Sequence, residues 1–174
     1  MTKAAKHKLI IMRHAKSDWS VPVPGDFDRP LTRRGNKDAP RMGAWLVAQG
    51  LIPDLIVSSP AMRARQTVLH VVESIRIPEQ EIIWEQALYL AELDTLLAEI
   101  SKYASRAGCL MLVGHNPGLD SLVEYLSDRP PGYRDGKLMT TAAVAVFDYS
   151  VTGLAAQEHG ARLEQLVRPK DLGK

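Results

Sequence analysis

The chain has 174 residues, with 22 Lys and Arg against 20 Asp and Glu, which gives a formal net charge of +2 at pH 7. Hydrophobic residues make up 45% of the chain and charged residues 24%, close to the globular average, which excludes collagen-like, coiled-coil and disordered classes. The length suits one domain with a sizeable core, and the absence of a long basic block from the sequence argues against nucleic acid as a partner.

Strand-like and helix-like segments alternate along the first half of the chain. Residues 8–13 form a continuous apolar run, which predicts a strand that is covered on both faces. Residues 32–49 have the spacing of a helix, which begins at Thr32, a good N-cap, and is followed by a glycine suited to the C-cap. A second apolar run at 54–57 leads into a helix-like segment at 61–74.

The same alternation continues in the second half. Residues 91–105 are helix-like, and residues 109–114 form a third apolar run of strand length. A helix is expected over 117–126 because it starts with proline, which is well tolerated in the first turn. The last apolar run, at 142–147, is predicted to be a fourth strand.

These elements predict a single α/β domain over residues 1–174, with three layers, α/β/α, around a mixed, mainly parallel central sheet. We expect residues 1–7 and 170–174 to be flexible. Two connections, at 20–30 and 127–140, are long and rich in Pro and Gly, which is typical of segments that flank a site. The sequence leaves open whether the connection at 127–140 folds over that site.

Three features favour a cytoplasmic protein. The single cysteine, Cys109, excludes an intrachain disulfide and suits a reducing compartment. Apolar stretches such as 142–147 are far shorter than the ~18 residues of a membrane span, so no membrane partner is expected. The basic N-terminal residues precede only the apolar run at 9–12, which is too short for the core of a signal peptide.

Four side chains are expected to converge at one edge of the sheet. The first strand ends at Arg13 and His14, the third ends at His115, and Arg63 lies in the first turn after the second strand. Parallel strands joined by right-handed crossovers place their carboxyl ends at one edge, where ligands bind in open α/β sheets. The four residues can therefore share a pocket.

Two arginines and two histidines beside helix N-termini suit a phosphate dianion. A neutral imidazole among these cations has a lowered pKa, which leaves a ring nitrogen free to attack phosphorus. The second histidine and the arginines then stabilise the charge on the equatorial oxygens. We expect no metal and no organic cofactor, because the arginines supply the positive charge.

Four sequence blocks resemble the histidine phosphatase superfamily. Residues 9–15 (LIIMRHA) are similar to its N-terminal signature, in which the first strand ends in Arg-His-Gly, and residues 30–35 (PLTRRG) are similar to its second block. Residues 58–67 (SSPAMRARQT) resemble the Ser-Pro-x-x-Arg-x-x-Gln-Thr block, and residues 113–116 (VGHN) resemble the block of the second histidine. The blocks occur in the family's order, and residues 139–142 resemble a fifth.

The resemblance implies a phosphoglycerate mutase-like fold and a metal-independent phosphatase that works through phosphohistidine on His14. It also implies that Arg13, Arg63 and His115 complete the phosphate pocket. The short chain, without the inserted lids of the mutases, most resembles the bacterial signal-inhibitory phosphohistidine phosphatase branch, whose members act in signal transduction on phosphotransfer proteins. The implied partner is a phosphorylated protein. A small phosphorylated molecule, cleaved by a general phosphomonoesterase, and a phosphoprotein-binding module without turnover are the alternatives.

Two positions depart from the family pattern. Ala15 stands where glycine is usual, which is tolerated if the backbone there stays extended. Leu90 stands where many phosphomonoesterases of the family carry a glutamate acid. An alkoxide leaving group needs such an acid, which is worth about 10² to 10⁴ in rate, whereas a protonated phosphohistidine needs it much less. If a carboxylate does supply the proton, the candidates are Asp18, Glu85 and Glu92.

Several other side chains have two open interpretations. Ser17 and Ser20 follow His14 and either bind the substrate's phosphate or cap the loop. Trp19 either forms a wall of the pocket or anchors that loop. A basic cluster is expected to be a solvated face of the helix at 32–49 or a docking surface for an acidic partner: Arg29, Arg33, Arg34, Lys37 and Arg41.

Overall fold

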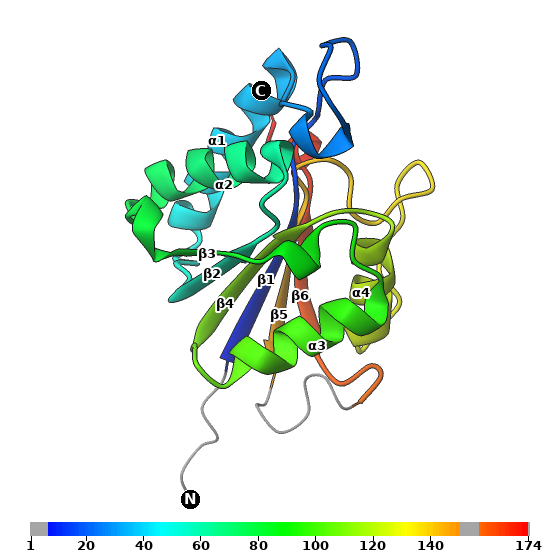
Figure 1. Cartoon of the computed structure of the whole chain (residues 1–174). Coiled ribbons are helices and arrows are strands. Elements are labelled where there is room, and N and C mark those ends of the chain that lie inside the picture. Colours follow the sequence, from blue (N-terminus) through cyan, green and yellow to red (C-terminus); the bar gives the residue numbers. More distant parts are fainter. Residues whose placement is uncertain (1–6, 150–156, 174) are drawn as a thin grey trace, which may run out of the picture.

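The computed structural model describes residues 7–149 and 157–173 (Figure 1). In chain order the strands are β1 (His7–Arg13), β2 (Leu55–Ser58), β3 (Ile82–Trp84), β4 (Cys109–Gly114), β5 (Val144–Tyr149) and β6 (Arg162–Val167). The α-helices are α1 (Arg33–Ala48), α2 (Met62–Ile75), α3 (Leu93–Ala104) and α4 (Gly118–Leu126). Short 3₁₀ helices are η1 (Asp26–Asp28), η2 (Glu79–Glu81), η3 (Gln86–Leu88) and η4 (Pro169–Leu172).

The strands of the described residues form one sheet with the order β3-β2-β4-β1-β5-β6. The pairs β3–β2, β2–β4 and β4–β1 are parallel, whereas β5 runs antiparallel to both β1 and β6. The predicted α/β fold with a mixed, mainly parallel sheet is confirmed. The two edge strands, β3 and β6, were not expected, because β3 is very short and β6 mixes polar with apolar residues.

The apolar residues of β1 alternate between two hydrophobic cores. Leu9 and Ile11 pack with residues of α3 and α4, whereas Ile10 and Met12 pack with residues of α1 and α2. All four side chains are fully buried. Two helices therefore cover each face of the sheet (Figure 1), and this double coverage explains why the run is continuously apolar.

Gly35 in the first turn of α1 brings that helix against the loop after β1. A Cβ atom at this position would lie 2.3 Å from the carbonyl oxygen of Lys16. Glycine is therefore required here by the close approach of two backbones, which gives the second sequence block a structural role. The N-cap is Thr32, as predicted, and its hydroxyl accepts a hydrogen bond from the Gly35 N–H.

Both ends of the described chain carry secondary structure. His7 begins β1, and residues 169–172 form η4, in which Asp171 forms an ion pair with Arg134 at 2.7 Å. The expected flexibility of residues 7 and 170–173 stays a prediction, and residues 1–6 and 174 of that expectation lie outside the described residues. Within the described ranges, no helix has the length and apolar character needed to cross a membrane.

Candidate active site

A pocket of about 300 Å³ lies at the carboxyl edge of the parallel strands. It brings together Arg13, His14, Arg63 and His115, which come from the ends of β1 and β4 and from the first turn of α2, the helix after β2. Ser17 also lines this pocket, but Ser20 does not. The convergence expected from strand order is therefore present in the structure.

The imidazole of His14 has a defined tautomer. Its Nδ1 lies 2.8 Å from the carbonyl oxygen of Ala15, and this carbonyl accepts only if Nδ1 carries the proton. Its Nε2 lies 3.4 Å from the Nε–H of Arg63, which donates to it. Burial lowers the pKa of His14 well below its ordinary value, and the charges of Arg13 and Arg63 lower it further. Nε2 is therefore unprotonated, and its lone pair becomes available to phosphorus when the Arg63 N–H turns to a bound phosphate.

His115 lies beside His14, with the ring centroids 5.1 Å apart. Its Nε2 is 2.8 Å from the Ser59 hydroxyl, while its buried Nδ1 has no hydrogen-bond partner among the described residues. Burial and the nearby charge of Arg63 lower the pKa of His115 to about 3. The second histidine is therefore neutral at physiological pH and can offer a hydrogen bond to a bound anion.

Contacts with backbone carbonyls orient two arginines of the pocket. Arg63 is almost fully buried, and its Nη1 donates to the carbonyl of Asp26 at 2.8 Å. Arg13 donates from Nη1 to the carbonyl of Met139 at 3.0 Å, and its buried Nε has no partner among the described residues. Carbonyl contacts orient both guanidinium groups, and Arg63 also pairs with the Asp26 carboxylate at 2.9 Å, so Arg13 can bind an anion directly and Arg63 can bind one in competition with Asp26.

Sequence reasoning missed Asp26, which lies in η1 beside the pocket. Its carboxylate accepts from Arg63 and Arg29, each at 2.9 Å, and from the hydroxyl of Tyr89 at 2.7 Å. Although partial burial raises its pKa, the hydrogen bonds from Tyr89 and the two arginines hold the pKa of Asp26 far below its ordinary value. Asp26 is therefore ionised and is a poor proton donor.

Arg29 corrects the prediction of a solvated basic face. It lies before α1, its exposed fraction is only 7%, and it lines the same pocket as His14. Its Nη1 donates to the Ser17 hydroxyl, and its guanidinium lies over the Trp19 ring at 3.6 Å. Trp19 thus forms part of the pocket wall. The position of Arg29 directly before the block at 30–35 was the available signal.

The three carboxylates named as proton donors all lie outside the pocket lining. Asp18 accepts a hydrogen bond from the Ser20 hydroxyl at 2.6 Å, so the two side chains bond to each other outside the pocket lining. Glu85 accepts from Lys102, which lowers the pKa of Glu85, and Glu92 is exposed. Leu90 lines the pocket with a backbone φ of 50°. Leu90, at the position where the resemblance in sequence places a glutamate acid, thus lines the pocket but cannot donate a proton.

Side chains of the third block connect it to the first two. Thr67 accepts from the Ala15 N–H at 2.9 Å and donates to the Arg63 carbonyl at 2.7 Å. Gln66 accepts from the Leu31 N–H at 2.8 Å. The Gln-Thr pair of the block therefore fixes the loop after β1 against α2, which places His14 opposite Arg63.

The chain matches a family model over residues 9–89 that is described as the histidine phosphatase superfamily, branch 1. A Mycobacterium tuberculosis protein named as uncharacterized is 34% identical over 140 residues, which cover 78% of this chain and 85% of that protein. The chain belongs to the histidine phosphatase superfamily. A phosphoglycerate mutase from Leifsonia xyli is 36% identical over 73 residues, which cover 41% of this chain and 29% of the mutase.

Solved structures of this superfamily share the fold. A SixA protein from Agrobacterium tumefaciens, provisionally named as a phosphohistidine phosphatase, is 26% identical with a TM-score of 0.76, covering 94% of this chain and 98% of that one. A SixA protein from Nakamurella multipartitia with the same provisional name is 27% identical with a TM-score of 0.78, covering 95% and 98%. Superfamily membership and these neighbours support a phosphatase.

Proposed function

We propose that this chain removes phosphoryl groups through a phosphohistidine intermediate on His14 and acts preferentially on phosphohistidine in proteins. The observation that carries this proposal is the tautomer of His14. With Nδ1 bonded to the Ala15 carbonyl, Nε2 is unprotonated in a pocket that also holds the charges of Arg13, Arg29 and Arg63.

In the first step, Nε2 of His14 attacks phosphorus and the bond to the leaving group breaks. The Nδ1–H to Ala15 contact stabilises the ring as its positive charge develops. We propose that Arg13, Arg63 and the neutral His115, which line the pocket with His14, bind the equatorial oxygens, where negative charge spreads in the transition state.

In the second step, water attacks the phosphorus of the intermediate. The P–N bond breaks, Nε2 regains its lone pair, and orthophosphate leaves. Both steps use positive charge that the arginines already provide, so we propose that the reaction proceeds without a metal ion or an organic cofactor.

The preference for phosphohistidine rests on the leaving group. The carboxylate that lines the pocket, Asp26, is ionised, and the Leu90 side chain cannot donate a proton. An alkoxide leaves slowly without an acid, whereas the imidazole of a protonated phosphohistidine leaves unaided. The provisional names of the SixA neighbours agree with this preference.

Two serines were candidates for binding the substrate. We propose that Ser17 acts by holding Arg29, since its hydroxyl accepts from that guanidinium in the pocket wall. For Ser20, whose hydroxyl is bonded to Asp18 outside the pocket lining, we propose a role in shaping the loop.

The test is orthophosphate release, in the presence of chelator, from a phosphohistidine-bearing protein and from p-nitrophenyl phosphate. We expect release from the first substrate, and His14→Ala abolishes it. His70→Ala is the matched control, because His70 lies on α2 and bonds to Asn36 outside the pocket lining. A preference for the ester would indicate a general phosphomonoesterase. Binding of the phosphoprotein without any release above the His14→Ala blank would indicate a binding module.

A further inference from the structure

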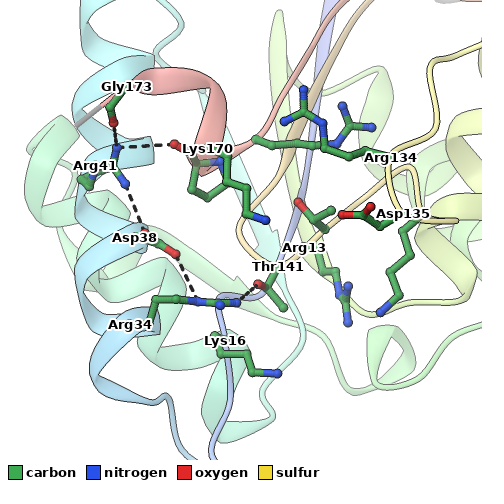
Figure 2. Close-up of a pocket in the computed structure, with 14 residues that line it drawn as sticks. Arg13, Lys16, Arg34, Asp38, Arg41, Arg134, Asp135, Thr141, Lys170 and Gly173 are labelled. Atoms are coloured by element: carbon green, nitrogen blue, oxygen red, sulfur yellow. Dashed lines mark hydrogen bonds and ion pairs between the residues drawn. The ribbon is translucent and has the colours of Figure 1, made fainter.

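A second cavity, of about 570 Å³, adjoins the catalytic pocket. Three residues line both cavities, Arg13, Lys16 and Thr141, so the two spaces share a wall. The rest of the second cavity is formed by α1, by the segment around Arg134 and by η4 (Figure 2). The two cavities are therefore adjacent, which is the arrangement that one extended ligand would need to occupy both.

The second cavity concentrates positive charge in a chain that is nearly neutral overall. Eight of its fourteen lining residues are basic, and two are acidic. The chain as a whole has a formal net charge of only +2. The basic residues are Arg13, Lys16, Arg34, Arg41, Arg134, Lys137, Arg168 and Lys170. Such a cavity is electrostatically suited to a compact ligand with several negative charges.

Much of this charge lacks a carboxylate partner. Asp38 forms ion pairs with Arg34 and Arg41 on the α1 side of the cavity (Figure 2). No ion pair among the described residues involves the ammonium groups of Lys16, Lys137 and Lys170. The positive charge there is thus available to a ligand.

Two buried guanidinium atoms in the wall also have no partner. Arg168 donates from Nη2 to the Gly132 carbonyl at 2.7 Å, but its buried Nε has no hydrogen-bond partner among the described residues. The same holds for the buried Nε of Arg13, which lines both cavities. Buried donors are normally satisfied, so these two guanidinium groups add positive charge to the wall that hydrogen bonds within the described residues do not fully satisfy.

We propose that the chain has a second activity, the hydrolysis of the terminal phosphoryl group of a phosphoanhydride, with the rest of the phosphate chain bound in this basic cavity. The proposal rests on His14 as the nucleophile. A phosphate leaving group needs no proton, which suits a catalytic pocket where Leu90 replaces an acid and Asp26 is ionised. The cavity stabilises that leaving group by charge.

The bond changes balance without a further reactant. Nε2 of His14 forms a bond to the terminal phosphorus, and the anhydride P–O bond breaks with its electron pair on the departing phosphate chain. Water then attacks the phosphorus on His14, the P–N bond breaks, and orthophosphate leaves together with one proton released to solvent. Inorganic tripolyphosphate would thus yield diphosphate and orthophosphate.

The test compares inorganic tripolyphosphate with the phosphohistidine protein, in chelator. The double variant Lys137→Ala/Lys170→Ala removes two charges from the cavity and no residue of the catalytic pocket. We expect it to raise KM for tripolyphosphate about tenfold and to leave the phosphohistidine reaction unchanged. The matched control, Arg106→Ala/Arg162→Ala, removes two exposed charges outside both cavities and leaves both reactions unchanged.

The outcomes separate this inference from the proposed function. No turnover of either substrate, or turnover that survives in His14→Ala, overturns both. Cleavage of phosphohistidine alone overturns only the phosphoanhydride activity, as does tripolyphosphate that binds in the cavity and inhibits without being cleaved. Tripolyphosphate cleavage that requires His14 but is insensitive to Lys137→Ala/Lys170→Ala also overturns the assignment of the cavity. Tripolyphosphate cleavage that is lost in His14→Ala and has a raised KM in Lys137→Ala/Lys170→Ala supports the phosphoanhydride activity.

Discussion

Thr67 on α2 accepts a hydrogen bond from the backbone N–H of Ala15, the residue directly after His14, at 2.9 Å. The same hydroxyl donates to the carbonyl of Arg63 at 2.7 Å. One fully buried side chain therefore links the loop that carries His14, the proposed nucleophile, to the turn that carries Arg63, a proposed phosphate ligand. The precision of the site depends on residues that never touch the substrate.

Replacing Thr67 with valine keeps the shape of the side chain but removes both hydrogen bonds. The buried N–H of Ala15 then has no partner, and we expect the free energy of unfolding to fall by about 2 kcal/mol. We also expect kcat for phosphate release to fall, because the loop after β1 is no longer held. Urea denaturation and steady-state kinetics measure the two effects. Thr67→Ser, which keeps the hydroxyl, is the control, and equal losses in both variants would contradict the role of the hydrogen bonds.

The Asp26 carboxylate pairs with Arg63 and Arg29, so we expect it to compete with phosphate for these two arginines. Removing its charge in Asp26→Asn should therefore lower the inhibition constant of orthophosphate about fivefold, since one like charge beside the anion is lost. Product inhibition of phosphate release measures this constant. Glu73→Gln removes an exposed charge near the far end of α2 and should leave it unchanged. Weaker inhibition in Asp26→Asn would mean that Asp26 mainly orients the arginines.

The sequence was sufficient to predict how His14 and His115 meet. Their strands are continuous apolar runs, and the handedness of parallel connections leaves one edge for both ends. Asp26 and Arg29 were not predictable in the same way, because the connection at 20–30 has no periodicity. Its path is fixed by contacts across the fold, such as the ion pair between Asp26 and Arg63.

The basic cavity was equally hidden from sequence patterns. It combines α1, η4 and the connection at 127–140, which are far apart in the chain. Arg34 and Arg41 were expected on a solvated helix face, and charge alone cannot show that a helix face lines a cavity. The packing of η4 against α1, including the contact of Arg41 with the Pro169 carbonyl, creates that cavity.

Stability should depend on pH through the buried histidines. The folded-state pKa of His115 is about 3, below the ordinary value of 6.5, so the unfolded chain binds more protons between these two values. The free energy of unfolding therefore falls as the pH is lowered from 6.5 towards 3. His115→Asn removes this contribution. Between pH 6.5 and 4.5, the free energy of unfolding of this variant should therefore fall by about 2 kcal/mol less than that of the unsubstituted chain. Denaturant unfolding across this range checks it, and identical slopes would mean that the pKa of His115 is the same in the folded and the unfolded chain.

Leu90 provides the sharpest test of substrate preference. It lines the catalytic pocket at the position where many relatives carry an acid, and its side chain is 52% exposed, so glutamate can replace it without entering the core. Leu90→Glu should raise kcat on an alkyl phosphate such as glycerol phosphate about tenfold, because the new carboxylic acid protonates the alkoxide. Phosphohistidine turnover, whose leaving group needs no such proton, should stay within about twofold.

Leu90→Gln is the matched control, because glutamine has the size of glutamate but supplies no proton. Orthophosphate release from glycerol phosphate, measured against pH, should show a new requirement for the protonated form in Leu90→Glu alone. Equal gains in the glutamate and glutamine variants would assign the effect to polarity rather than to proton transfer. No gain in either variant would show that the acid is not what limits ester hydrolysis here, and the preference for phosphohistidine would then have to come from the shape of the pocket.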